Sequence, residues 1–245
     1  MNGWLDPVRE ALEDAPTTVD FFFRDDDAGW ADARLHALLA VFERAAAPID
    51  LAVIPCALSR RLARELASLK PLVRVHQHGY AHADHEPVGR KCEFGPARDE
   101  ASQRADIDAG RRLLADPLEQ PLDPIFTPPW NRCTETTGRI LVELGFGVLS
   151  RDASVPPLGL DRLAELPIAL DWFAHRRGVR LSRDDLGRKL AALVRVGGPV
   201  GVMLHHAVTD DDELRSVAEL VAALERHDAA RFVPMAELAL AAAAR

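Results

Sequence analysis

Apolar residues in this chain alternate between short continuous runs and longer stretches with helical spacing. Strand-length runs cover 19–23, 49–54, 72–75, 124–126, 146–149, 163–170 and 200–204. Between them, 31–46, 59–69, 98–114, 134–144 and 182–196 carry apolar residues three and four apart. A polar amphipathic helix over 4–16 precedes this series, and a short strand at 231–233 and an Ala-rich helix follow it. The alternation predicts parallel βα units rather than a β-sandwich.

Capping residues sharpen several of these helix boundaries. Ser59 and Thr134 precede helical stretches, and Ser182 with Asp185 resembles a capping box. Thr209 and the acids after it predict the start of a helix that continues to about residue 226. Gly145 is expected to end the helix over 134–144.

Length and charge limit the class of protein. A (β/α) barrel commonly uses about 250 residues as one unit, and this chain of 245 residues shows no repeat or linker, so we expect a single domain over 1–245. The net charge is −8 and no long block of Lys or Arg occurs, which argues against nucleic acid or a membrane surface as a partner.

Compartment is inferred from the first residues and the cysteines. Residues 1–20 lack the apolar core of a secretory signal, and no apolar run is long enough to span a bilayer. The cysteines are odd in number and widely spaced, at Cys56, Cys92 and Cys133, which argues against a disulfide framework and a CxxC zinc site. We therefore expect a cytoplasmic protein.

Polar and aromatic residues gather just after the predicted strands. In a parallel barrel these positions meet at one mouth, where active sites lie. They are Asp25, Asp26, Asp27, His76, His78, His82, Pro129, Trp130, Asp152, Asp171, Trp172, His205 and His206.

Three consecutive carboxylates, Asp25, Asp26 and Asp27, follow the apolar run 19–23. Adjacent acids at a buried strand end repel one another, and a bound cation would remove that cost. The alternative is that they cap the next helix and face water.

His78 and His82 are four residues apart. One helical turn would bring their β-carbons within about 6 Å, as a divalent ion requires. With a carboxylate from the first strand they would form a two-His, one-Asp set with open positions. Gly79 stands where a zincin has its glutamate, so that class is excluded, whereas an ordinary surface pair remains the alternative.

His205 follows the apolar run 200–204 and suits a proton donor or acceptor, because histidine titrates near neutrality. A buried, hydrogen-bonded histidine is the alternative. Trp130 and Trp172 are candidates for an aromatic wall that contacts a sugar or acyl group, or for core packing.

These motifs resemble the polysaccharide deacetylase family, also called the NodB homology domain. Its T-F-D-D-G motif is similar to residues 23–27, and its H-S/T-x-x-H motif to 78–82. Its R-x-P-Y/W and L-x-H motifs resemble 127–130 and 203–206, in the family's order. The resemblance implies an α/β fold of the distorted (β/α)7 barrel type, like that of glycoside hydrolases and deacetylases.

The resemblance also implies roles for individual residues. Asp26, His78 and His82 would hold a divalent ion, most commonly zinc, while Asp25 would be the general base and His205 the general acid. The Trp130 backbone N–H would help to hold the oxyanion. Arg24, Trp130, Asp171 and Trp172 are the predicted substrate contacts.

Three departures from the motifs affect these roles. Thr127 replaces the motif arginine that orients the base, and Arg24 or Arg132 is a candidate substitute. Gly79 replaces Ser or Thr. Asp27 replaces glycine, so the assignment of the three aspartates can shift by one residue.

The predicted function is that of a metal-dependent hydrolase that removes an acetyl or other small acyl group from the nitrogen of an N-acylated sugar or related small molecule. Its partner would be a small-molecule or oligosaccharide substrate. The alternatives are hydrolysis of another C–N bond in a small metabolite, and a catalytically silent protein that binds metal or carbohydrate.

Overall fold

A nine-stranded sheet, curled on itself, is the centre of the computed structural model, which describes residues 3–118 and 122–243. The strands run in the order β6-β5-β4-β3-β2-β1-β10-β7, with β11 beside the start of β1, and the pairs between them are parallel. Their bounds are β1 (Val19–Ala28), β2 (Ile49–Val53), β3 (Val73–His78), β4 (Ile125–Thr127), β5 (Val148–Leu149), β6 (Ala164–Glu165), β7 (Leu170–Asp171), β10 (Val200–Leu204) and β11 (Ala230–Phe232).

The segment 164–171 closes the barrel. Its first half pairs with β5, where the Ala164 N–H donates to the Gly147 carbonyl, and its second half pairs with β10, where the Ala169 N–H donates to Gly201. Counted as one strand, β6 and β7 complete a ring of seven with β1 to β5 and β10. The predicted distorted (β/α)7 barrel is therefore confirmed, and the two-residue ladders of β5, β6 and β7 are where it is distorted.

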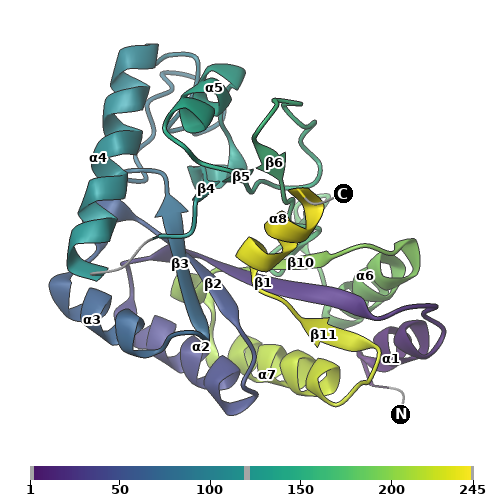
Figure 1. The fold of residues 1–245 in the computed structure, drawn as a ribbon. Coiled ribbons are helices and arrows are strands. Elements are labelled where there is room, and N and C mark those ends of the chain that lie inside the picture. Colours follow the sequence, from purple (N-terminus) through teal and green to yellow (C-terminus); the bar gives the residue numbers. More distant parts are fainter. Residues whose placement is uncertain (1–2, 119–121, 244–245) are drawn as a thin grey trace.

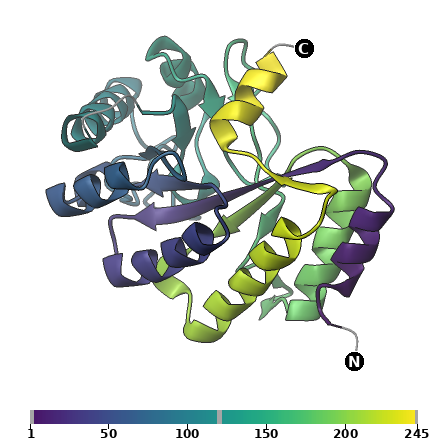
Figure 2. The same ribbon diagram turned by 60° about the horizontal axis from the view of Figure 1, so that its bottom comes forward.

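Helices surround this ring (Figures 1 and 2), and α1 lies beside α6 in both views. No helix connects β5 to β6, and the antiparallel pair β8 (His175–Arg176) and β9 (Val179–Arg180) follows β7 among the described residues. The helices are α1 (Asp6–Glu13), α2 (Asp32–Arg44), α3 (Arg60–Ser68), α4 (Glu100–Leu118), α5 (Glu135–Glu143), α6 (Arg183–Val196), α7 (Asp211–Glu225) and α8 (Met235–Ala243).

Most of the predicted caps are present. Ser59 accepts a hydrogen bond from the Leu62 N–H, and Thr134 and Ser182 form capping boxes. At α7 the prediction was wrong by one residue: the Asp210 side chain caps the helix, whereas Thr209 donates to the His205 carbonyl. Within 3–118 and 122–243, no helix combines the length and the apolar character needed to cross a membrane.

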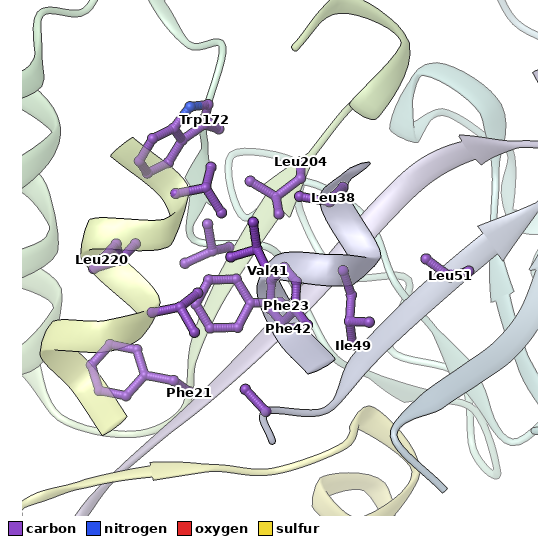
Figure 3. Close-up of a cluster of buried hydrophobic side chains, with 14 of the residues drawn as sticks. Phe21, Phe23, Leu38, Val41, Phe42, Ile49, Leu51, Trp172, Leu204 and Leu220 are labelled. Carbon is purple, nitrogen blue, oxygen red and sulfur yellow. The ribbon is translucent and has the colours of Figure 1, made fainter. Parts of the chain in front are cut away.

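Alternate residues of β1 face two different cores. Phe21 and Phe23 point outward and pack with residues such as Phe42 from the helices, as Figure 3 shows. Phe22 points inward, and Gly201 leaves room for it, since a Cβ at Gly201 would lie 2.2 Å from its ring. This two-residue period sends the next odd and even side chains of β1 to opposite faces.

Helix α8 covers the inside of the barrel near the starts of the strands. Its Met235 and Leu238 pack in the inner cluster with Phe22. The Met235 N–H donates to the Asp50 carboxylate, which comes from the beginning of β2. With α8 at this end, the opposite mouth is free for the polar residues after the strands.

Candidate active site

The sequence predicted that the first strand ends at Phe23, before the acidic triplet. In the structure, β1 continues through the triplet to Ala28. Its register with β2 shifts after Asp25, because three steps along β1 from Asp25 to Ala28 match two along β2 from Leu51 to Val53. The extra residue is a β-bulge, and Asp27 lies in it with a left-handed φ of 70°.

This bulge decides where each aspartate points. Arg24 and Asp26 are two residues apart and share the inner face of β1. Asp25 contacts His206 on the outer side of the strand. In a regular strand Asp27 would follow Asp25 outward, but at the bulge its side chain reaches His78 instead.

Asp27, His78 and His82 offer ligand atoms that all lie within 4.8 Å of one another. Asp27 Oδ1 is 3.2 Å from His78 Nε2 and 3.1 Å from His82 Nε2. Nδ1 of His78 is 3.0 Å from the Thr127 carbonyl, to which it can only donate, so in the neutral ring Nε2 presents its lone pair. This donor set fits a divalent cation such as zinc.

The electrostatics of this set favour a positive charge in it. Burial raises the pKa of Asp27, but hydrogen bonds with His78 and His82 outweigh it and bring the pKa well below its usual value. Burial lowers the pKa of His78, whereas Asp27 and Asp26 raise it by more. The carboxylate is therefore ionised at neutral pH, as a metal ligand must be.

The two histidines do not lie on one helical turn, so that part of the prediction was wrong. His78 ends β3 and His82 lies in the loop that follows, with left-handed backbone at Gly79 (φ 56°) and His82 (φ 55°). Their rings nevertheless come together, with centroids 5.2 Å apart.

Glu93 holds this loop in shape. It is fully buried, and its carboxylate accepts hydrogen bonds from the N–H groups of Tyr80 at 3.1 Å, Ala81 at 2.8 Å and Ala83 at 3.3 Å. A Cβ at Gly79 would lie 2.1 Å from its Oε2 atom. The space that a Ser or Thr at 79 would need is thus occupied by Glu93.

Asp26, the predicted third ligand, is paired with Arg24. The guanidinium donates from Nε to Oδ1 at 2.7 Å and from Nη2 to Oδ2 at 2.8 Å. Burial raises the pKa of Asp26, but Arg24, His78 and His205 together lower it by more. Asp26 is therefore an oriented carboxylate, held ionised beside the cluster of Asp27 and the two histidines.

Arg24, a predicted substrate contact, occupies the interior of the barrel and is fully buried, so its guanidinium bonds protein groups in this structure. Besides Asp26, it donates to Ser150 at 2.8 Å and to Asn131 at 2.8 Å. Thr127, which stands at the position of the motif arginine, instead pairs its hydroxyl with His76. The guanidinium at the carboxylate thus comes from β1 itself.

Asp25, the predicted base, is fully buried and bound to His206. Its Oδ1 accepts from the His206 N–H at 2.9 Å, and its Oδ2 lies 2.6 Å from Nδ1 of the same residue. Nε2 of His206 is 2.7 Å from the Trp30 carbonyl, so both ring nitrogens face acceptors. Burial lowers the pKa of His206, but the Asp25 carboxylate raises it by more, so that the pKa is about 9. Asp25 is therefore engaged with His206 and is not part of the cluster of Asp27, His78 and His82.

His205 lies at the end of β10, on the inner side of the barrel. It is partly exposed, its ring is 6.2 Å from that of Phe173, and its charge is among those that lower the pKa of Asp26. The structure therefore brings together Asp26, Asp27, His78, His82 and His205.

The predicted aromatic wall is only partly present. Trp130 packs against His82, with ring centroids 4.4 Å apart. Trp172 is fully buried, packs on Trp4 and donates to Glu213, so it belongs to the core. Asp171 ends β7 half-buried and accepts from the Phe173 N–H.

Trp30 is the aromatic residue that sequence reasoning missed. It is 42% exposed, and its ring lies 5.0 Å from that of His82. An apolar residue beside Gly29, after the acidic triplet, was the available signal.

Comparison with known proteins finds no matching family model and no matching curated sequence. Solved structures do match at probability 1.00. A protein from Mycobacterium smegmatis, provisionally assigned as a polysaccharide deacetylase, aligns with TM-score 0.74 and 19% identity over 93% of this chain and 91% of its own. The chain has the fold of the polysaccharide deacetylases.

Other solved structures share this deacetylase fold. The allantoinase PuuE aligns with TM-score 0.69 and 13% identity, over 91% of this chain and 90% of its own. A family 4 acetyl xylan esterase from Clostridium thermocellum, solved with a cobalt ion, aligns with TM-score 0.59 and 11% identity over 89% of both chains. The same fold also occurs in a family 4 pseudoenzyme from Bacillus anthracis, with 11% identity and TM-score 0.63 over 92% of this chain and 66% of its own.

Proposed function

We propose that this protein is a metal-dependent hydrolase that removes an acetyl or other small acyl group from the nitrogen of an N-acylated sugar or related small molecule. The observation that carries this proposal is the juxtaposition of the cluster Asp27, His78 and His82 with the ionised Asp26. A deacetylase fold and a cobalt-bound neighbour support it.

The metal would be held by Asp27, His78 and His82, with zinc as the first candidate. Relative to the roles implied by the motifs, the aspartates shift by one residue, so that Asp27 is the ligand and Asp26 the base. When bound, the ion would polarise the carbonyl and lower the pKa of a water molecule. His78 already has its Nδ1 held by the Thr127 carbonyl, which fixes the orientation of its ring.

Asp26 is the proposed general base. Its pKa lies below the usual range, so it is unprotonated at neutral pH, and Arg24 fixes its orientation with two hydrogen bonds. His205 is the proposed general acid, which gives its proton to the departing nitrogen. The Trp130 N–H remains the proposed oxyanion donor, and Trp130 and Trp30 the proposed flanks of the bound substrate.

A second candidate is hydrolysis of another C–N bond, such as that of a ring amide. The allantoinase neighbour favours it, with a TM-score of 0.69. The same base and acid serve both reactions, because in each reaction a water molecule attacks a carbonyl carbon and the departing nitrogen is protonated. Incubation with N-acetylated sugars and with cyclic amides separates the two, since only the former releases acetate.

The test uses Asp25→Asn, Asp26→Asn and Asp27→Asn variants purified without a metal-affinity tag. We expect about one zinc per chain in the wild type, a loss of metal in Asp27→Asn, and retained metal in Asp26→Asn with acetate release at least about 100-fold lower. Asp25→Asn should retain metal and turnover.

Loss of metal in Asp26→Asn but not in Asp27→Asn would instead support the assignment implied by the family motifs, with Asp26 as the metal ligand and Asp25 as the base. Zinc binding without turnover of any amide would support the catalytically silent alternative, which the pseudoenzyme neighbour illustrates.

A further inference from the structure

Three cations lie together beside the candidate site. Arg90 and Lys91 belong to the loop between β3 and α4, and Arg132 follows β4. The Arg132 guanidinium donates to the Lys91 carbonyl at 2.8 Å. Burial and the charge of Arg90 both lower the pKa of Arg132, so Arg90 and Arg132 are close enough to repel each other.

These cations form no ion pair in the part of the chain that the structure describes. Among the described residues, no carboxylate oxygen lies within 4.0 Å of the charged nitrogens of Arg90, Lys91 or Arg132. This contrasts with the ion pairs that most arginines on the helices form, such as Arg61 with Glu65. Like charges gathered without a partner are unfavourable in a free protein, and binding of an anion would relieve their repulsion.

The carboxylates of the same loop accept hydrogen bonds from backbone N–H groups. Asp84 accepts from the N–H groups of Glu86 and Cys92, and Glu86 accepts from that of Ala97. Glu93 is buried under the His78–His82 segment. The loop therefore directs its negative charges mainly to backbone N–H groups. Asp84 lies near enough to Lys91 for the lysine's charge to help lower the pKa of Asp84, but the two side chains form no ion pair within 4.0 Å among the described residues.

Trp130 connects these cations to the candidate active site. Lys91 Nζ lies 5.9 Å from the centroid of the Trp130 ring, and the same ring is 4.4 Å from that of His82. A molecule that lies against Trp130 with its acyl group toward His82 would thus place its other end near Lys91.

We propose that the substrate carries an anionic group, a phosphate or carboxylate, that Lys91, Arg90 and Arg132 bind. This inference rests on the proposed function for the position of the acyl group, and it narrows the substrate class to acidic N-acylated molecules.

The test is calorimetric binding to zinc-loaded protein of N-acetylglucosamine, its 6-phosphate and N-acetylmuramic acid. The variants are Arg90→Glu with Lys91→Glu, and Lys189→Glu as a control for charge reversal on the exposed outer side of α6. We expect one of the anionic probes to bind the wild type and Lys189→Glu at least about tenfold more tightly than the neutral sugar, and to lose this preference in the double variant. Inorganic phosphate is titrated in parallel to measure anion binding at the metal alone.

Equal affinity for neutral and anionic probes, absence of binding by both anionic probes, or a preference that survives in the double variant would overturn the proposal. Acetate release and zinc content, measured on the same samples, report on the proposed function separately. Turnover without an anionic preference would refute only the substrate class, whereas a preference without turnover would refute only the reaction.

Discussion

At the scale of single residues, the site depends on which side chains share a face of β1. Arg24 and Asp26 meet because they are two apart on a strand, so this pair follows from the backbone period alone. Sequence patterns indicated that His78 and His82 belong together, and the structure brings them together. The sequence patterns could not indicate which aspartate joins the two histidines, because that depends on a one-residue bulge at Asp27.

Arg24→Lys is expected to lower turnover about 10- to 100-fold while zinc content stays the same. Lysine keeps the charge but cannot make two parallel bonds to Asp26, so the base loses its fixed orientation. Steady-state kinetics with metal analysis checks this. Ser150→Ala removes only one partner of the same guanidinium and should cost less than about tenfold. Wild-type turnover in Arg24→Lys would contradict the role given to the guanidinium.

His206 is expected to make stability depend on pH. Its pKa rises from 6.5 to about 9 on folding, so its contribution is fully present below pH 6.5 and is lost as the pH rises through 9. By this linkage, the difference in unfolding free energy between wild type and His206→Asn should shrink by up to about 3 kcal/mol from pH 6 to pH 10. Urea unfolding at several pH values measures it, and a constant difference would show that His206 stays neutral.

At the scale of elements, helices and most of their caps could be predicted because they follow from local signals. Ser59, Thr134 and Ser182 cap the helices that their sequence neighbourhoods indicate. The loop that carries His82 could not be predicted, since its shape depends on Glu93, eleven residues further along the chain. Spacing alone suggested a helical turn there.

Gly79→Ala is expected to weaken zinc binding at least about tenfold. Its Cβ would lie 2.1 Å from Glu93 Oε2 and 2.6 Å from the Pro129 ring, and the left-handed backbone adds about 1–2 kcal/mol of strain. Gly89→Ala is the matched control, because Gly89 also has positive φ but no heavy atom within 4 Å of the added Cβ. Zinc titration against a competing chelator measures both, and equal affinities would mean that loop crowding does not affect the site.

At the scale of the whole molecule, the barrel could be predicted from the order of strands and helices. Its closure could not, because the segment 164–171 changes partner from β5 to β10 halfway along its length. That exchange is a long-range event, set by which strand edges remain free after the others have paired. The polar interior also needed the structure, since the inward and outward residues of β3 from Val75 to His78 are all buried.

The closed end of the barrel contains a carboxyl group that destabilises the fold at neutral pH. Burial raises the pKa of Asp50 to about 7, so stability falls as the pH rises from 3.8 to 7 and stays reduced above it. Asp50→Asn keeps an acceptor for the Met235 N–H and removes this titration. The variant should gain on the order of 4 kcal/mol over wild type between pH 4 and pH 8. Thermal unfolding at both pH values tests this, and an unchanged gap would argue against a charged Asp50.

The position of Arg24 on the same strand as Asp26 has a consequence for how such a site evolves. When a base and its orienting cation come from different strands, a drift in either strand separates them. Here residues 24–27 carry the cation, the proposed base and a proposed metal ligand in one peptide. Thr127, at the position of the motif arginine, instead pairs its hydroxyl with His76. The relative positions of these residues therefore depend on the geometry of one strand and its bulge rather than on the spacing between two strands.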